Sequence, residues 1–356
     1  MSNYESINFN KLKPAKIILP TFLGLGIVVW LFIKNIDNID FSILNFSIYT
    51  LIFLFFAFLM MVFRDFGYII RLRLLSDKTL SWRKCFRIIM LWEFASAITP
   101  SAVGGTALAT VFIWKEGLNI GKSTSIVIAT SFLDELYFSI MFPFIFLFFT
   151  SSELFTVVNS NFFTNKLLYF VLTGYIIKLV WTILMGYSIF GNPKLIANII
   201  ERLFRLRILK RWHPAANKLA NDFETSNIEL KNKSLKFWIK SFLTTFLSWT
   251  SRYWVLNFIL LSFLFSVNFT TSISVSEHFL IFARQLIMWI MMLVMPTPGG
   301  SGFIEMIFTT YMSNFVAVAE FIVIIALIWR LVTYYPYLII GSIITPKWIS
   351  KNFKKK

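Results

Sequence analysis

Long apolar blocks alternate with short polar and basic segments along the chain. A bilayer core is about 30 Å thick, and a helix of roughly 20 apolar residues crosses it. Lipid offers no partner for backbone N–H and C=O groups, so such blocks form helices. The pattern predicts an all-α polytopic membrane protein with about six full spans, and core helices of a large soluble protein are the alternative. The predicted spans are residues 17–33, 43–63, 123–149, 167–190, 237–265 and 321–344.

Two further apolar stretches are interrupted by Pro and Gly. Residues 85–114 contain TPSAVGG, beginning at Thr99, and residues 279–313 contain MPTPGGSG, beginning at Met295. Pro removes a helix hydrogen bond and Gly frees the backbone, so we expect two broken or re-entrant helical elements. One such element in each half favours an inverted repeat with a transport site between the halves. Kinks that merely permit close helix packing are the alternative.

Lys and Arg gather at one set of ends of these blocks. The net charge of +17 would suggest nucleic acid in a soluble protein, but the positive-inside rule accounts for it here. Connectors 35–42 and 266–277 hold no Lys or Arg. We therefore place both termini in the cytoplasm of a cell (inner or plasma) membrane, with anionic lipid headgroups as partners and no nucleic acid. The basic segments are residues 11–16, 64–87, 194–236 and 347–356.

This topology divides a single membrane domain, residues 1–356, into four parts. The first half is 17–190, within which the basic stretch 64–84 is cytoplasmic. A basic cytoplasmic loop, a second half and a basic cytoplasmic tail follow at 191–236, 237–345 and 346–356. Apolar and basic positions alternate at helical spacing over 194–210, which predicts an amphipathic helix on the membrane, or one packed on the protein's own cytoplasmic face.

Few residues suit metal or nucleotide chemistry. One cysteine, Cys85, excludes an internal disulfide, and two distant histidines, His213 and His278, make no Cys/His metal cluster. Residues 117–123 read GLNIGKS, which is one residue short of the P-loop spacing. We expect no cofactor, no metal and no assigned catalytic residue. Transport would be passive, ion-coupled or driven by consumption of the lipid.

The two interruptions carry a resemblance to a known family. The first reads Pro-x-x-x-Gly-Gly from Pro100 to Gly105, and the second reads Pro-x-Pro-Gly-Gly-x-Gly-x-x-Glu from Pro296 to Glu305. With Arg330 in the last span, the chain resembles the flippase-like transmembrane domain of lysylphosphatidylglycerol synthases, found also as stand-alone membrane proteins. The resemblance runs from about residue 22 to residue 345. It implies lipid translocation or an allied membrane role.

The sequence departs from that family in two places. The family often has an Arg-x-x-Asp-like pair after the first break, but here only the acid, Asp134, is matched, so a basic partner is missing there. We also expect the soluble aminoacyl-transferring domain of the bifunctional members to be absent. We therefore expect no synthase reaction in this chain, and a separate soluble lipid synthase is a candidate partner.

Ionisable residues inside predicted spans are the candidates for function, because each costs about 2.5–3.5 kcal/mol at a helix centre. A broken helix directs free N–H groups at a phosphate, which a nearby Arg could also bind. Glu93 and Glu305 flank the breaks and would receive a cationic headgroup or couple protons. For any one charge, a structural ion pair is the alternative. The predicted substrate-binding residues are Glu93, Thr99, Pro100, Gly104, Gly105, Asp134, Arg252, Arg284, Pro296, Pro298, Gly299, Gly300, Gly302, Glu305 and Arg330.

These residues favour a flippase-like protein that moves an anionic, aminoacylated or polyprenyl-linked lipid between leaflets. A membrane-embedded lipid-modifying transferase is the first alternative, with Glu93, Asp134 and Glu305 as acid or base. The second alternative is a membrane scaffold for a separate soluble synthase, in which the loop 191–236 carries the function.

Overall fold

All elements in the described part of the chain are helical. The predicted first span, the amphipathic segment 194–210 and most of the second Pro/Gly motif lie outside the described residues. The computed structural model describes residues 47–99, 102–155, 161–191, 228–267, 273–292, 303–316 and 318–353, together with positions 33, 42, 44, 198 and 202.

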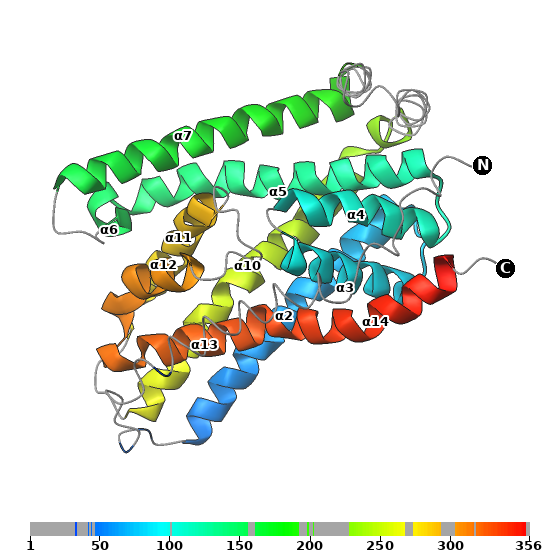
Figure 1. Cartoon of the computed structure of the whole chain (residues 1–356). Coiled ribbons are helices and arrows are strands. Elements are labelled where there is room, and N and C mark those ends of the chain that lie inside the picture. The colour runs from blue at the N-terminus through cyan, green and yellow to red at the C-terminus, as the bar shows by residue number, and fades with distance from the viewer. Residues whose placement is uncertain are drawn as a thin grey trace.

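Two long helices, α2 (Ile48–Leu75) and α10 (Leu235–Ser266), cross the middle of the molecule along its most extensive helix–helix interface (Figure 1). Each begins at a serine whose hydroxyl accepts a hydrogen bond from a backbone N–H in the first turn. Their axes approach closely at Gly67, where a Cβ would overlap the Ser248 hydroxyl and lie 2.8 Å from the Thr244 carbonyl oxygen. Glycine at this position therefore sets the distance between the two helices.

Helices α3 (Trp82–Ile98) and α4 (Ala102–Lys115) form a hairpin. The turn follows Thr99, which is extended (φ −96°, ψ 139°), as expected for the residue before a proline. At the base, Lys84 Nζ donates to the Glu116 carbonyl oxygen at 2.5 Å. The two helices have 17 and 14 residues, about 25 Å and 21 Å, so each is shorter than a bilayer core. The break predicted within 85–114 thus lies between two short helices.

An outer layer is formed by α5 (Ile120–Phe148) and α7 (Asn161–Gly186), which run side by side (Figure 1). A short helix, α6 (Ser151–Phe155), follows α5. A turn of π-helix, η3 (Tyr187–Gly191), extends α7. Many large apolar side chains of this layer are exposed, among them Leu147, Ile177 and Val180. Such a surface suits contact with lipid.

The second half contains α11 (Val275–Met292) and α12 (Phe303–Met312), on either side of the segment that holds the second motif. Two short 3₁₀ turns, η5 (Ser313–Phe315) and η6 (Ala319–Phe321), lead to α13 (Ile322–Thr333). Helix α14 (Tyr335–Phe353) completes the described chain. Figure 1 shows α11 and α12 toward the end of the molecule opposite the α3–α4 hairpin.

Four segments of the described chain are long and apolar enough to cross a membrane: α2, α5, α7 with η3, and α13 with α14. They correspond to four of the six predicted spans. Helix α10 matches the predicted span 237–265 in length, but Arg252, Asn257 and its many hydroxyl groups make it more polar, and it is not among the four. The structure therefore confirms an all-helical protein with several spans, whereas the count of six is not confirmed.

Two predicted helix boundaries differ from the observed ones. The span predicted at 43–63 is part of α2, which continues to Leu75 and buries Arg64 and Arg71, because acidic groups of other helices pair with them. The span 321–344 was expected to be one helix, yet it is interrupted at Tyr334 (φ −127°, ψ −53°). Pro336 lies just beyond this break, and proline has no N–H to continue the ladder.

Candidate functional site

One face of α2 carries three large polar side chains, Arg64, Tyr68 and Arg71, spaced so that they lie above one another along the helix. All three are buried. Both guanidinium groups lie against the Tyr68 ring, with their central carbons 4.8 Å (Arg64) and 4.7 Å (Arg71) from its centroid. Cation–π attraction therefore joins the two cations through one ring. We call these three residues and the acidic groups that they contact the α2 charge ladder.

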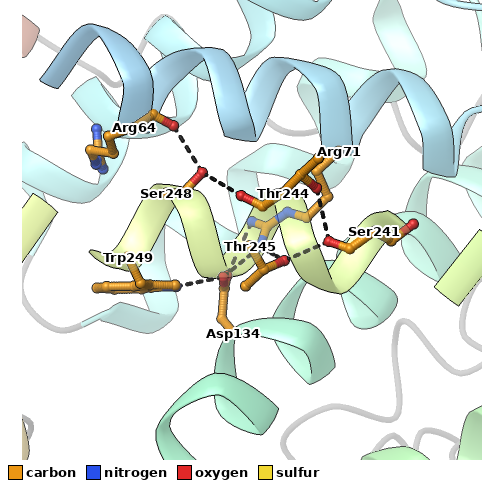
Figure 2. A network of polar contacts seen from close by, with 8 residues as sticks. All are labelled: Arg64, Arg71, Asp134, Ser241, Thr244, Thr245, Ser248 and Trp249. Atoms are coloured by element: carbon orange, nitrogen blue, oxygen red, sulfur yellow. Dashed lines mark hydrogen bonds and ion pairs between the residues drawn. The ribbon is translucent and has the colours of Figure 1, made fainter. Parts of the chain in front are cut away.

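Arg71 forms the first ion pair of this ladder, with Asp134 of α5 (Figure 2). Its two terminal nitrogens donate to the two carboxylate oxygens at 2.5 Å and 3.2 Å. Arg71 also donates to Thr245 Oγ1 at 2.9 Å, and the Trp249 indole N–H donates to Asp134 at 2.7 Å. Asp134 was predicted to lack a basic partner. The prediction is wrong because the partner comes from α2 and not from the neighbouring residues of α5.

Arg64 forms the second group of ion pairs. Its guanidinium nitrogens lie 2.6 Å from Glu93 of α3 and 2.8 Å from Asp65, the next residue of α2. The Tyr337 hydroxyl of α14 donates to both Asp65 oxygens at 2.9 Å. The side chains of Asp65 and Glu93 are 21% and 22% exposed, whereas that of Arg64 is 2% exposed. The buried Arg64 guanidinium thus pairs with two carboxylates that are themselves partly exposed.

Arg252 adjoins the ladder through an aromatic ring. It lies near the middle of α10, half-buried, with its central carbon 5.6 Å from the centroid of Trp249, the residue that donates to Asp134. Within the described part of the chain, Arg252 makes no ion pair or hydrogen bond. Three predicted site residues, Glu93, Asp134 and Arg252, are therefore brought into one connected network.

The other two predicted arginines lie elsewhere. Arg284 of α11 is buried and donates through Nε and Nη2 to the Glu153 carbonyl oxygen at 3.0 Å and 2.8 Å. Its Nη1 donates to the Tyr311 carbonyl oxygen at 2.8 Å. This arginine therefore ties α6 and α12 to α11. Arg330 is buried on α13, with its central carbon 5.0 Å from the ring centroid of Tyr334, at the break between α13 and α14.

The first Pro/Gly motif has a clear packing role at two positions. Thr99 Oγ1 donates to the Ala95 carbonyl oxygen at 2.7 Å and ends α3. A Cβ on Gly105 would overlap the Ser96 hydroxyl and lie 2.8 Å from its Cα. Gly105 thus permits close contact between α3 and α4, as the packing alternative expects. The predicted positions Pro100, Pro296, Pro298, Gly299, Gly300 and Gly302 lie outside the described residues. Gly104 and Glu305 belong to α4 and α12, but the surroundings of Gly104 and the side chain of Glu305 also lie outside the described part.

The prediction from sequence missed Arg64, Asp65, Arg71 and Tyr337. A usable signal was present, because Arg64, Tyr68 and Arg71 fall on one helical face within a stretch that is otherwise mostly apolar. Lys178 of α7 lies within a predicted span and is paired with Glu135 of α5 at 2.6 Å, as the structural alternative for a single charge expects.

The positive and negative side chains of the α2 charge ladder are equal in number when Arg252 is included. The three cations are Arg64, Arg71 and Arg252, and the three carboxylates are those of Asp65, Glu93 and Asp134. A pocket between α10 and residues 315–325 is lined by apolar side chains, among them Phe263 and Ile325, and lacks such charge. Of these two regions, the one formed by α2, α3, α5 and α10 is the one that carries charge.

Known proteins resemble this chain over most of its length. The sequence model of a family described as "Lysylphosphatidylglycerol synthase TM region" matches residues 17–341. A protein of Archaeoglobus fulgidus named "UPF0104 membrane protein" is 28% identical over 297 residues, which cover 81% of this chain and 84% of that protein. No solved structure matches the chain.

Proposed function

Because the chain belongs to the lysylphosphatidylglycerol synthase TM region family, we propose that it is a flippase-like membrane protein that moves lipid between leaflets. The lipid would be anionic, aminoacylated or polyprenyl-linked. The observation that carries the proposal is the α2 charge ladder, in which Arg64 and Arg71 are buried in a long apolar helix. Charged residues inside membrane segments are costly, and they commonly mark substrate or ion pathways.

Arg252 is the residue that we assign to the phosphate of the headgroup. Its guanidinium rests near the Trp249 ring and makes no hydrogen bond within the described residues. Arginine binds phosphate through two parallel N–H groups, and an aromatic platform holds the fork in place. Arg64 and Arg71, in contrast, already have carboxylate partners. A phosphate would therefore bind Arg252 without displacing an existing ion pair.

The two interrupted helical elements support a path across the bilayer. The α3–α4 hairpin and the α11–α12 pair lie toward opposite ends of the molecule (Figure 1). In the proposed topology both termini are cytoplasmic, so the hairpin would enter from the cytoplasm and α11–α12 from outside. Discontinuous helices of this kind line the binding sites of many secondary transporters.

The transferase alternative is less well supported by the geometry. Glu93, Asp134 and Glu305 would be its acid or base, yet Glu93 and Asp134 are each held by an arginine at 2.6 Å or less. Asp134 also accepts a hydrogen bond from Trp249. With this many donors, Asp134 is a poor general base, because its lone pairs are already engaged. A new covalent lipid product after incubation with membranes would favour the transferase.

The test is lipid exchange in reconstituted vesicles. Purified full-length protein is placed in vesicles with fluorescent phosphatidylglycerol or its lysyl ester, and a membrane-impermeant reductant measures how much label reaches the outer leaflet. We expect faster exchange than in protein-free vesicles. Vesicles in which no tested lipid exchanges faster would overturn the proposal.

Arg252→Met tests the assigned residue, and Lys240→Met is its matched control. Both remove one cation from α10, but Lys240 is exposed near the start of the helix. We expect Arg252→Met to abolish most of the exchange while the melting temperature changes little, and Lys240→Met to preserve it. Equal loss in both variants would argue against a phosphate contact at Arg252.

A further inference from the structure

Three polar contacts join α5 to α7 in the outer layer of the helix bundle. Lys178 Nζ of α7 lies 2.6 Å and 2.8 Å from the two carboxylate oxygens of Glu135. The hydroxyl oxygens of Ser139 and Thr182 are 3.1 Å apart, and the Tyr175 hydroxyl donates to the Ser139 carbonyl oxygen at 3.1 Å. Tyr175, Lys178 and Thr182 are spaced by three and four residues, so they share one face of α7. We call these five residues the α5–α7 seam.

Most of α7 outside the seam is apolar and exposed, as Ile176, Val180 and Ile183 show. Among the four apolar spans of the described chain, the one that contains α7 has the smallest buried share. The ion pair therefore lies at a helix that borders lipid, where charged side chains are costly. Helices that only pack against each other in lipid use small and hydroxyl side chains, so a charge pair here indicates a further role.

Aromatic rings connect Lys178 to the candidate functional site. Its Nζ is 5.4 Å from the centroid of the Phe138 ring, and that ring is 4.7 Å from the Trp249 ring, centroid to centroid. Arg252 lies against the same Trp249 ring, at 5.6 Å. The side chains of Lys178 and Glu135 are 12% and 21% exposed, so a polar group in the surrounding membrane has access to the pair. One cation at the seam and one on α10 are therefore linked through two rings.

The interface between α2 and α10 lacks these features. It is the most extensive helix–helix interface of the described chain, and the two helices are in close contact at Gly67. Toward its other end, the hydroxyls of Thr50 and Ser266 contact each other at 3.0 Å, and both residues are buried. Of the two interfaces, the α5–α7 seam is the one with an ion pair between its helices in the described structure.

We propose that a phospholipid headgroup enters the bundle between α5 and α7, and that Lys178 is the first cation to bind its phosphate. This inference rests on the proposed function, for which it supplies a lateral route to Arg252. A phosphate oxygen accepts the same charge-assisted hydrogen bonds as a carboxylate oxygen, so the headgroup replaces Glu135 as the partner of Lys178. The acyl chains stay in the bilayer, along the exposed apolar side of α7.

Two pairs of contacting hydroxyls provide matched cross-links for the test. Ser139→Cys with Thr182→Cys joins α5 to α7, and Thr50→Cys with Ser266→Cys joins α2 to α10. The native Cys85 is buried. Full-length protein is oxidised in phosphatidylglycerol vesicles, and loss of reaction with a maleimide confirms each disulfide. Albumin then extracts fluorescent phosphatidylglycerol from the outer leaflet, which measures exchange and leaves the disulfides intact.

We expect the cross-link between α5 and α7 to abolish most of the lipid exchange, and a thiol reductant to restore it. The cross-link between α2 and α10 should leave exchange unchanged, because that interface stays closed in the proposed route. Equal exchange before and after oxidation of the α5–α7 variant, or equal loss in both variants, overturns the inference. If neither the unmodified protein nor the reduced variants exchange lipid, the proposed function fails instead.

Lys178→Met combined with Glu135→Gln tests the cation itself, because the double change removes the positive charge without leaving a lone carboxylate in the membrane. We expect slower exchange of phosphatidylglycerol in this variant, with little change in melting temperature. Lys178→Arg is the matched control, since it keeps a cation that donates to phosphate, and it should retain exchange. Unchanged exchange in the double variant overturns the role of Lys178. The cross-link result decides the route whether or not the double variant folds.

Discussion

Arg71 of α2 and Asp134 of α5, 63 residues apart in the chain, meet through two N–H···O contacts inside the helix bundle. The same carboxylate accepts a hydrogen bond from Trp249 of α10, and the same arginine donates to Thr245. Three helices therefore converge on one ion pair, as Figure 2 shows. An interaction in this position fixes how α2, α5 and α10 pack as well as how charge is distributed.

We expect each single substitution of this pair to destabilise the protein by about 3–5 kcal/mol, because it leaves a buried charge without a partner. The variants are Arg71→Met and Asp134→Asn. The double variant should recover much of the loss, since an ion pair replaced by uncharged groups of similar size is often tolerated. The measurement is the midpoint of thermal unfolding in detergent, followed by size-exclusion chromatography of the surviving folded fraction.

Lys122→Met provides the control for that experiment. Lys122 contacts Asp77 and Glu229 at 3.3 Å and 3.1 Å, at the surface, where Glu229 is 59% exposed. Exposed ion pairs contribute about 0–1 kcal/mol. A loss in Lys122→Met as large as that in Arg71→Met would show that the position of the pair inside the bundle has no special effect.

Local patterns in the sequence were sufficient for the helices but not for the ion pairs between them. The apolar blocks predicted α5 and α7 closely, because a span requires a continuous apolar stretch that composition shows directly. Arg64 and Arg71 were assigned to the cytoplasm because Lys and Arg cluster over residues 64–87, whereas their partners, Glu93 and Asp134, belong to helices that follow later in the chain. No property of α2 alone identifies those partners.

The break between α13 and α14 is a different case. Pro336 lies two residues beyond Tyr334, and a proline has no N–H to donate to the carbonyl of the preceding helical turn. The sequence therefore contained an indication of the break, but the continuous hydrophobicity of 321–344 led to the prediction of a single helix. The contact that anchors the break, from the Tyr334 hydroxyl to the Ala97 carbonyl oxygen at 2.9 Å, joins segments 237 residues apart and could not be predicted locally.

Gly105→Ala should destabilise the α3–α4 hairpin by about 1–3 kcal/mol, as overpacking of a well-packed contact does. The new methyl group would overlap Ser96 and approach its Cα at 2.8 Å, and a main-chain atom cannot move aside as a side chain can. The expected result is a lower unfolding temperature and faster proteolysis near the turn.

Gly174→Ala is the matched control, since Gly174 is also helical and close to one neighbour. Its new methyl group would meet Ile290 Cγ2 at 2.9 Å, a side-chain methyl group and not a main-chain atom. Alanine also has a higher helix propensity than glycine, by about 1 kcal/mol. We expect Gly174→Ala to cost clearly less stability than Gly105→Ala. A loss equal to that of Gly105→Ala would contradict the role given to the Ser96 backbone.

Arg284→Lys should lower the melting temperature while the preference among lipid headgroups stays unchanged. The planar guanidinium contacts two carbonyl oxygens, those of Glu153 and Tyr311, on different elements. A lysine ammonium is a point donor that does not reproduce the fork. Relative exchange of phosphatidylglycerol and its lysyl ester in vesicles is the second measurement. Changed preference with unchanged stability would reassign Arg284 to the lipid.

The C-terminal helix should be held less firmly to the base of the hairpin in Trp348→Phe. Glu116 is 7% exposed, and its Oε1 accepts hydrogen bonds from Arg87 at 2.8 Å and from the Trp348 indole N–H at 3.0 Å. Phenylalanine keeps a ring against Phe112 but has no N–H, so the buried Glu116 carboxylate loses one donor, at a cost of about 1–3 kcal/mol.

Trp82→Phe is the control, because Trp82 is 50% exposed and stacks on Phe66. Hydrogen exchange near the start of α3 and the end of α4 should increase in Trp348→Phe alone. Equal exchange in both variants would mean that the Trp348 indole N–H does not secure the base of the hairpin.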